Sequence, residues 1–455
     1  MSSFSSRNPG FYKRLWTLSL PVILQNLITF SLGLIDTFMV SQLGNKEMAA
    51  VTTANVPVFL LISIVFGVQS QYWGKGDTRS INRAIGVAAF IGTGITVVLA
   101  VVFFLFPVQV MDLLSNSHEL SLLGAPYLRV IGFSYVFNML SSIYASAQRS
   151  VENTTFGMKL FGFSTLVNTG LNYLLIFGHG GFPALGVAGA AIATLLARVS
   201  EFAICVVCAV RSRVIPLDLT ALLHPGMDMA RRFLKYASPV VLNEACWGMG
   251  NSMLTVILGY TDNSVEMLAA NAVMGNLSRL LLVVCFGLGA ATAVLVGKAI
   301  GEGQSHQDVL ELSQELLRFS TLIGAGIAVL SLLLIPTLFV PVLFPMFKLY
   351  GESIAIATAL AVTAFAGIPL HAYAISAVTG VLRAGGDVAY ATALDLLPQW
   401  VICLPITALC ALVLKSGYWS IAIAIQVESI VKVPFCIRRV RGGTWIHDVT
   451  RGQRT

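Results

Sequence analysis

The stretch "FSLGLIDTFMVSQLG", residues 30–44, places one carboxylate, Asp36, inside a long apolar run. The chain has 455 residues, of which 56% are hydrophobic and only 11% are charged. Soluble domains are roughly 45–50% apolar and about 25% charged, so the composition predicts an integral membrane protein. An acid in the middle of a membrane span costs about 2.5–3.5 kcal/mol. Asp36 must therefore face other helices or a water-filled cavity.

Apolar runs recur along the whole chain, and each is long enough for a spanning helix, which needs about 20 residues. The first run is too long for a cleaved signal peptide, so we expect it to remain as the first helix. The seven cysteines lie in or beside these runs, which indicates no disulfide framework. We predict an all-α protein with twelve transmembrane helices near residues 15–42, 50–70, 84–108, 124–147, 157–178, 185–210, 234–260, 267–297, 316–346, 354–382, 388–413 and 417–437.

The net charge of +7 follows the membrane topology and does not indicate a nucleic-acid partner. With a cytoplasmic N-terminus, most Lys and Arg residues fall in cytoplasmic loops and tails. The opposite loops hold only Lys46, Arg129, Lys348 and Lys415. Because cytoplasmic loops carry an excess of Lys and Arg, we expect a multi-pass membrane protein with both termini in the cytoplasm.

The chain contains an internal repeat. "LSLPVILQN" at 18–26 resembles "YASPVVLNE" at 236–244, which places Pro21 over Pro239. Two halves of six spans each enter the membrane from the same side, as in transporters with parallel repeats. We expect an N-terminal six-helix lobe at 1–210, a cytoplasmic linker at 211–232, a C-terminal six-helix lobe at 233–437 and a basic cytoplasmic tail at 438–455.

The two halves differ in length at the second helix of each. Aligning "QYWGKGD" at 71–77 with "KAIGEGQ" at 298–304 leaves the first half seven residues short. Seven residues correspond to about two helical turns, or about 10 Å of helix. We therefore expect a short second helix between residues 50 and 70.

Polar residues on the first helix share a face with Asp36. Gln25, Thr29 and Gly33 precede it at helical spacing. The fifth helix offers Asn168 and Asn172, four residues apart, and the sixth offers Thr194. Such a pocket lets a carboxyl group gain and lose a proton near neutral pH. The alternative is that Asp36 is a structural hydrogen-bonding group or lies among the outer lipid headgroups.

Proline inside the first helix leaves a backbone carbonyl unpaired. Pro21 therefore marks either a site of bending or a static kink.

The second half carries weaker candidates. Glu244 begins a polar stripe on the seventh helix that includes Asn251, and it serves either as a site residue or as an ion-pair partner of Arg279. His371 is either a hydrogen-bonded packing residue or a proton carrier. Asp395 is an intramembrane acid without an obvious partner. The spacing of Arg198 with Glu201, and of Glu428 with Lys432, predicts two local ion pairs.

Several motifs, in order, resemble those of bacterial multidrug and toxic compound extrusion (MATE) transporters. They are the pattern from Pro21 to Val40, "NTGLNYLLIFG" at 168–178, "GVAGAAIAT" at 186–194 and "GVLRAGGD" at 380–387. The resemblance implies a V-shaped pair of lobes in the bacterial cytoplasmic membrane that exports bulky, often cationic or amphipathic compounds in exchange for inward H⁺ or Na⁺. It also implies that Asp36 and the polar residues of the fifth helix form a cation site.

Some MATE relatives bind Na⁺ in the second lobe through a Glu where Trp247 stands here and an Asp near His371 or Ala372. Neither acid is present in this chain, which favours H⁺ coupling.

The sequence argues against two other functions, a lipid flippase and an intramembrane enzyme. A flippase for lipid-linked precursors would need a strongly cationic cavity, yet only Arg198, Arg279 and Lys432 lie within the spans. An intramembrane enzyme would need paired catalytic groups, and the sequence offers neither these nor a phosphate loop or metal-ligand cluster. We therefore expect a monomeric antiporter in the lipid bilayer that takes drug-like small molecules and needs no cofactor beyond its coupling ion.

Overall fold

The computed structural model describes residues 10–55, 69–115 and 117–450, and their regular structure is entirely helical, as predicted. Ten helical stretches among these residues are long and apolar enough to cross a membrane. They are α2 (Phe11–Ser41), α6 (Thr78–Leu105), α8 (His118–Ser150), α9 (Thr154–Phe177), α10 (Gly186–Arg211), α13 (Ser264–Gly301), His306–Met346, Glu352–Leu382, Val388–Val413 and α19 (Tyr418–Gly442).

The two remaining predicted spans have separate explanations. The second predicted span, at 50–70, includes residues 56–68, which lie outside the described residues, so its length is not tested. The flanking helices are α3 (Asn45–Ala54) and α5 (Gln69–Gly74). The seventh is α12 (Met227–Gly259), a helix of 33 residues. Its polar residues, among them Asn243, Glu244 and Asn251, lower its hydropathy. It is the structural counterpart of α2, whose polar face carries Asp36.

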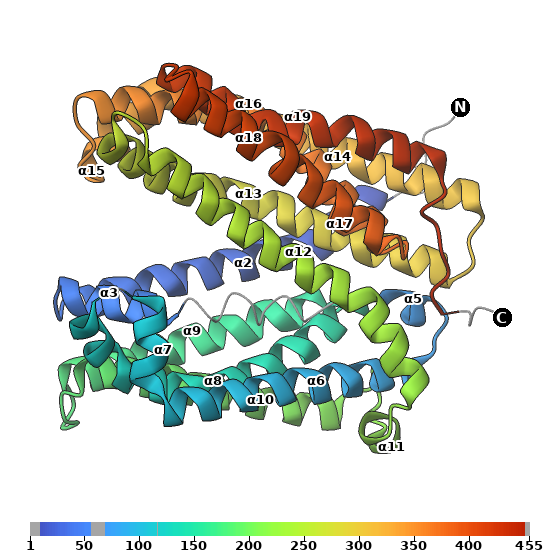
Figure 1. Cartoon of the computed structure of the whole chain (residues 1–455). Helices are drawn as coiled ribbons and strands as arrows, with labels where there is room; N and C mark the ends of the chain where they lie inside the picture. The colour runs from blue at the N-terminus through green and yellow to red at the C-terminus, as the bar shows by residue number, and fades with distance from the viewer. Residues whose placement is uncertain (1–9, 56–68, 116, 451–455) are drawn as a thin grey trace. The chain divides into compact units, whose positions relative to one another are not determined.

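The helices form two compact units, and Figure 1 shows the helices within each unit running alongside one another. The N-terminal unit comprises residues 24–241, and the C-terminal unit comprises the residues up to 23 together with 242–455. Besides the helices already named, the N-terminal unit includes α7 (Pro107–Leu114) and α11 (Leu219–Leu223). The C-terminal unit also includes α14 (His306–Leu334), η1 (Ile335–Leu343), α15 (Phe344–Met346), α16 (Glu352–Ile375), η2 (Ser376–Leu382), α17 (Val388–Leu397), η3 (Pro398–Cys403), α18 (Leu404–Ala408) and η4 (Leu409–Val413).

These boundaries differ from the expected lobes of 1–210 and 233–437, because α2 and α12 each belong to both units. Leu15 and Leu18 at the start of α2 are buried in a hydrophobic core with residues of α13, α14 and α19. Phe233 and Ala237 at the start of α12 are buried in the core of the N-terminal unit. Each helix passes from one unit to the other two residues beyond its proline, Pro21 or Pro239.

The expected linker at 211–232 is folded onto the N-terminal unit. Ile215 and Ala221 are buried, and the side-chain amide of Asn82 on α6 donates a hydrogen bond to the carbonyl oxygen of Pro216 at 2.9 Å. From Met227 onward the chain already belongs to α12. Apolar residues within the polar connection explain why it does not remain a free linker.

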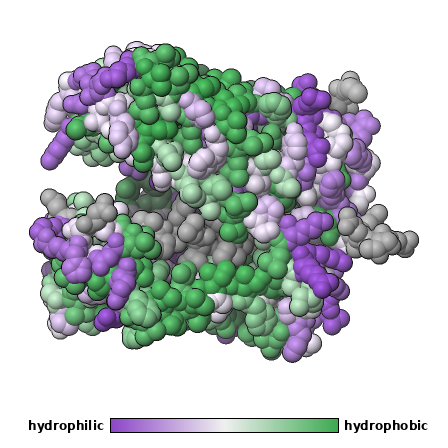
Figure 2. Space-filling model, in the orientation of Figure 1, coloured by the Kyte–Doolittle hydropathy of each residue, from purple (hydrophilic) through white to green (hydrophobic). Residues whose placement is uncertain are grey.

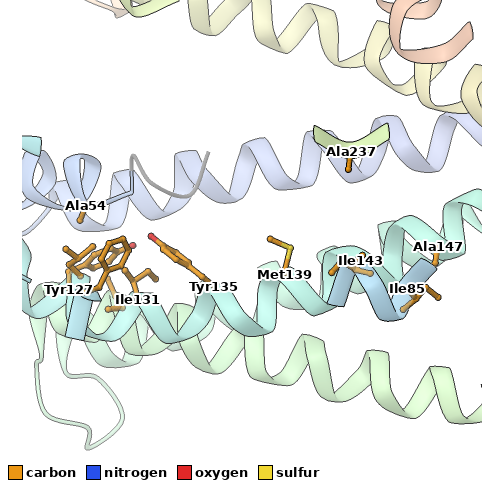
Figure 3. Close-up of a cluster of buried hydrophobic side chains, with 14 of the residues drawn as sticks. Ala54, Ile85, Tyr127, Ile131, Tyr135, Met139, Ile143, Ala147 and Ala237 are labelled. Carbon is orange, nitrogen blue, oxygen red and sulfur yellow. The ribbon is translucent and has the colours of Figure 1, made fainter. Parts of the chain in front are cut away.

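The core of the N-terminal unit is organised around α8. Tyr127, Ile131, Tyr135, Met139 and Ile143 are spaced four residues apart and all are buried. Residues at this spacing lie on one face of a helix, and Figure 3 shows the labelled side chains along one side of α8. On the face shown in Figure 2, apolar residues cover the middle of the helices in both units and hydrophilic residues gather at their ends.

The C-terminal unit contains four π-helical segments, η1 to η4. Proline stands in η1 at positions 336 and 341, and Pro398 begins η3. Proline cannot donate the backbone hydrogen bond that an α-helix needs at that position, and π-helical turns accommodate such interruptions. The wider turns rotate the residues that follow, so helix faces in this unit depart from simple 3.6-residue spacing.

The expected basic tail at 438–455 is largely structured, because α19 continues to Gly442 and the next residues fold back. The side chain of Trp445 is fully buried and its indole nitrogen donates to the carbonyl oxygen of Val440 at 3.0 Å. The backbone N–H of His447 donates to the carbonyl oxygen of Gly385 at 2.8 Å. A Cβ at Gly385 would collide with the Trp445 ring, so the motif "GVLRAGGD" forms the surface on which this C-terminal strap, residues 443–449, packs.

Replacement of Trp445 by Ala is expected to destabilise the C-terminal unit by about 3–5 kcal/mol, because the substitution leaves a cavity where a large buried ring was. Thermal melting of the detergent-purified protein measures this loss. Trp419→Ala is the matched control, since that ring is 46% exposed on α19. Equal melting temperatures for the two variants would show that the strap contributes little.

Candidate functional site

Asp36 lies at the end of a chain of hydrogen bonds that joins three helices of the N-terminal unit. The side-chain amide of Asn172 on α9 donates to Asp36 Oδ1 on α2 at 2.6 Å and to Asn168 Oδ1 at 3.0 Å. The amide of Asn168 in turn donates to Thr194 Oγ1 on α10 at 3.1 Å. The structure therefore brings together the four residues that the sequence placed first among the site candidates.

Local sequence explains why these groups meet. Asn168 and Asn172 are one helical turn apart on α9, and both are 1% exposed. Gly189 lets α10 approach α9, because a Cβ at this position would collide with the backbone carbonyl of Leu175. Thr194 lies on α10 a little over one turn beyond Gly189. Close approach through small residues is the usual basis of helix packing in membranes.

The surroundings of Asp36 contain polar amides and few charges. Among the described residues, no Lys or Arg forms an ion pair with Asp36. Arg198, on α10 after Thr194, pairs instead with Glu201 at 2.6 Å, which confirms that predicted ion pair. Asn172 Oδ1 is buried and has no hydrogen-bond partner among the described residues. Asp36 is thus a partly buried carboxyl group whose closest polar neighbour is a neutral amide.

The other predicted residues of the first helix stand apart from this chain of bonds. The hydroxyl of Thr29 donates to the backbone carbonyl of Gln25 at 2.9 Å, and the Gln25 side chain lies against Gly157 of α9. Neither side chain reaches Asp36. Gln25 and Thr29 therefore share a helix face with Asp36, but they do not hydrogen-bond to it.

The C-terminal unit contains a second polar cluster, the charged network, formed by Glu244, Arg383, Asp395, Glu428 and Lys432. Arg383 contacts Glu244 Oε1 at 3.4 Å and Asp395 Oδ2 at 3.3 Å. Lys432 contacts Asp395 Oδ1 at 3.0 Å and Glu428 Oε1 at 2.7 Å, which confirms the second predicted local pair. Asn243 also donates to Asp395 Oδ2, at 3.1 Å. Asp395 is the centre of the network.

This network corrects two expectations. Glu244 was expected to pair with Arg279 if it formed an ion pair, but its partner is Arg383, and Arg279 is exposed. Asp395 was expected to lack a partner, yet both of its oxygens are occupied. Arg383 was one of the Lys and Arg residues that we expected in cytoplasmic loops, whereas its side chain is only 9% exposed. Its position within the glycine-rich motif "GVLRAGGD" was the available signal.

His371 and Asn251 do not join the charged network. His371 lies between Gln426 and Ser429 of α19, at 3.3 Å from Gln426 Oε1 and 3.0 Å from Ser429 Oγ. The amide of Asn251 donates to the carbonyl oxygen of Trp247 on its own helix at 3.1 Å. These contacts are those of packing residues with satisfied hydrogen bonds.

Comparison with known proteins agrees with this architecture. The family model MatE matches residues 21–174 and 239–409, so it begins at Pro21 in one half and at Pro239 in the other. The chain therefore belongs to the MatE family, whose members are membrane transporters and not enzymes.

Relatives from several bacteria support the assignment. The uncharacterized transporter YisQ of Bacillus subtilis (strain 168) is 23% identical over 440 residues, with 95% of this chain and 94% of that protein covered. The multidrug resistance protein MdtK of Pectobacterium atrosepticum is 24% identical and covers 88% of each chain. The probable multidrug resistance protein NorM of Thermotoga maritima is 26% identical over 66% of this chain and 65% of its own.

Solved structures show the same fold. A crystal structure of MATE in complex with MaL6 matches with a TM-score of 0.77 and 18% identity, over 95% of this chain and 96% of that one. An outward-facing multidrug resistance MATE family transporter of the MOP superfamily matches with a TM-score of 0.76, 18% identity and the same coverage.

Replacement of Asp395 by Asn is expected to destabilise the protein by about 1–3 kcal/mol, because Arg383 and Lys432 each lose a charge-assisted hydrogen bond, although Glu244 and Glu428 still contact them. The measurement is thermal melting in detergent. Asp262→Asn is the matched control, because Asp262 pairs with Lys415 at 3.1 Å on an exposed surface, where ion pairs contribute little. If both variants melt alike, the network is not a stabilising element of the C-terminal unit.

Proposed function

We propose that this transporter is a proton-coupled antiporter in which Asp36 carries the proton. The observation that supports the proposal is the hydrogen-bond chain from Thr194 to Asp36, which ends on a carboxyl group with no paired cation among the described residues. A carboxylate in a membrane interior is costly unless it is paired or protonated. Asp36 is therefore poised to bind and release a proton during the transport cycle.

The amide of Asn172 suits both states of Asp36. When Asp36 is ionised, the amide N–H group donates to it. When Asp36 is protonated, the carboxyl group becomes a donor, and Asn172 Oδ1, which has no partner among the described residues, is on the same amide. Rotation of that amide would exchange a donor for an acceptor. The Asn172 amide can thus offer a hydrogen-bond partner to either form of Asp36, which a proton carrier requires.

We infer that the exported substrates are drug-like small molecules, amphipathic or cationic, because relatives in this family are described as multidrug resistance proteins. The flippase alternative receives no support from the charge distribution. Arg198 and Lys432 are both neutralised by neighbouring carboxylates, so neither supplies a free cationic surface for a phosphate-bearing lipid. We further infer cytoplasmic termini from the distribution of Lys and Arg, and a monomeric transporter.

We assign Pro21 the role of a bending point in α2. It lies two residues before α2 passes into the N-terminal unit, and proline removes one backbone hydrogen bond from the helix. Solved relatives have been described in a straight and in a bent conformation. Bending at Pro21 would move Asp36 relative to the start of the same helix, which would link proton binding to the change of access.

Replacement of Asp36 by Asn is expected to abolish gradient-driven efflux while substrate binding is retained, because Asn keeps the shape of the side chain but cannot release a proton. Efflux of a fluorescent cationic dye from proteoliposomes measures the first property, and equilibrium dye binding in detergent measures the second. Asp262→Asn, an exposed acid in the C-terminal unit, serves as the control and should transport normally. Normal efflux by Asp36→Asn would rule out Asp36 as the proton carrier.

An imposed pH gradient is expected to drive export by the unmodified protein, and a sodium gradient alone is expected not to. The physical reason is that Asp36 has one neutral amide as its close partner, a setting that holds a proton more readily than a metal ion with several oxygen ligands. Proteoliposomes with each gradient imposed separately provide the measurement. Export driven by sodium at equal pH on both sides would contradict proton coupling.

A further inference from the structure

The charged network of the C-terminal unit contains its own cations. Three carboxylates (Glu244, Asp395 and Glu428) share two basic groups (Arg383 and Lys432), and every carboxylate contacts at least one of them. Asp395 receives three N–H donors, Lys432 on Oδ1 and both Arg383 and Asn243 on Oδ2. Since a carboxylate has about four lone-pair sites, Asp395 is nearly saturated by groups of the protein itself.

The N-terminal unit is arranged differently. Asp36 contacts the neutral amide of Asn172, and the nearby Arg198 is engaged with Glu201. One unit therefore holds an acid without an attached cation among the described residues, and the other holds acids that are already bound to cations. This difference has a direct consequence for the ions that each unit can accept.

We propose that Arg383 and Lys432 act as tethered counter-ions that exclude an exchangeable metal cation such as Na⁺ from the C-terminal unit. They contact both carboxylate oxygens of Asp395 and one oxygen each of Glu244 and Glu428, which Na⁺ would need as ligands. The inference rests on the proposed function, because it concerns the ion specificity of the same transporter. It makes Arg383 and Lys432 specificity-determining residues and not merely structural ones.

The positions of the two cations support this role. Arginine remains charged at all relevant pH values, so Arg383 cannot leave the network by losing a proton. Its backbone is fixed by a hydrogen bond from its N–H to the carbonyl oxygen of Val378 at 3.1 Å, and the adjoining Gly385 packs against Trp445. Lys432 is 9% exposed and bridges two carboxylates on different helices. Expelling either cation would leave an uncompensated buried acid, at a large cost.

Other titratable side chains lie near the network without joining it. His371 on α16 is bonded to α19 through Gln426 and Ser429. Cys403 on η3 is bonded to backbone carbonyls of α19, and Cys436 lies one turn beyond Lys432. The positive charge that contacts the three carboxylates therefore comes from Arg383 and Lys432.

The test is to remove one tethered cation and ask whether Na⁺ takes its place. All proteins carry Asp36→Asn, so that a response to Na⁺ cannot arise from that acid. Melting temperatures in detergent are compared in sodium chloride and in choline chloride at equal ionic strength and mildly alkaline pH. The parent should melt equally in both salts. Lys432→Met should melt several degrees higher in sodium, with a saturable dependence, because ligand binding to the folded state stabilises it.

Two controls define the result. Lys415→Met frees Asp262 on an exposed surface and should show no sodium response, and Lys432→Arg keeps the tethered charge and should behave as the parent does. Glu428→Gln/Lys432→Met preserves the net charge of the network and serves if the single variant does not fold. It should also be stabilised by sodium, although less strongly.

A parent protein that is already stabilised by sodium would overturn the proposal. The proposal would also be overturned if Lys432→Met, or Glu428→Gln/Lys432→Met where the single variant does not fold, melted at the same temperature in both salts. Because the readout is ion binding and not transport, it is independent of the efflux test. If Asp36→Asn leaves efflux intact, the proposed function fails, whereas the role of the tethered cations is decided by these melting curves alone.

Discussion

A charge inside a membrane protein has no bulk water to stabilise it, and this constraint governs every polar group in the interior of the two units. The protein meets it in two ways. Arg198 with Glu201, and Lys432 with Glu428 and Asp395, are neutralised by opposite charges. Asp36 is held by one amide hydrogen bond, from Asn172, which stabilises the ionised form less completely than an opposite charge would. Asp36 thus lacks, among the described residues, the paired cation that these other groups have, and our proposal that it carries the proton rests on this difference.

The two halves of the chain share the position of one proline and differ in the residues that follow it. The family model begins at Pro21 and again at Pro239, and both prolines stand two residues before the helix leaves one unit for the other. Beyond these shared features the halves diverge. On α2, Asp36 comes about four helical turns after Pro21. On α12, Glu244 comes little more than one turn after Pro239. Four π-helical segments are described in the C-terminal unit. This divergence accompanies the difference in charge between the halves, since Asp36 contacts a neutral amide and Asp395 contacts Arg383 and Lys432.

The sequence was sufficient for features that depend on local spacing. Asn168 and Asn172 lie one turn apart, as do the members of the predicted ion pairs, and helical periodicity places such residues on one face whatever the tertiary structure. The partners of Asp395 could not be predicted in the same way. They lie on other elements of the chain, and the π-helical turn before Arg383 changes the face that this residue presents. The burial of Ile215 and Trp445 depends on neighbours distant in sequence, so a polar connection and a basic tail were expected where folded segments exist. The two units also divide the chain at residues other than the expected lobe boundaries, because the burial of the first turns of α2 and α12 depends on such distant neighbours.

The packing of Trp445 against Gly385 has a consequence for biogenesis. The turn that carries Arg383 is synthesised some sixty residues before the ring that covers it, so the surface around Gly385 remains uncovered until Trp445 has been made. Residues 443–449 follow α19 in the chain, so their docking onto Gly385 comes after this helix has been synthesised and completes the support for the buried Arg383.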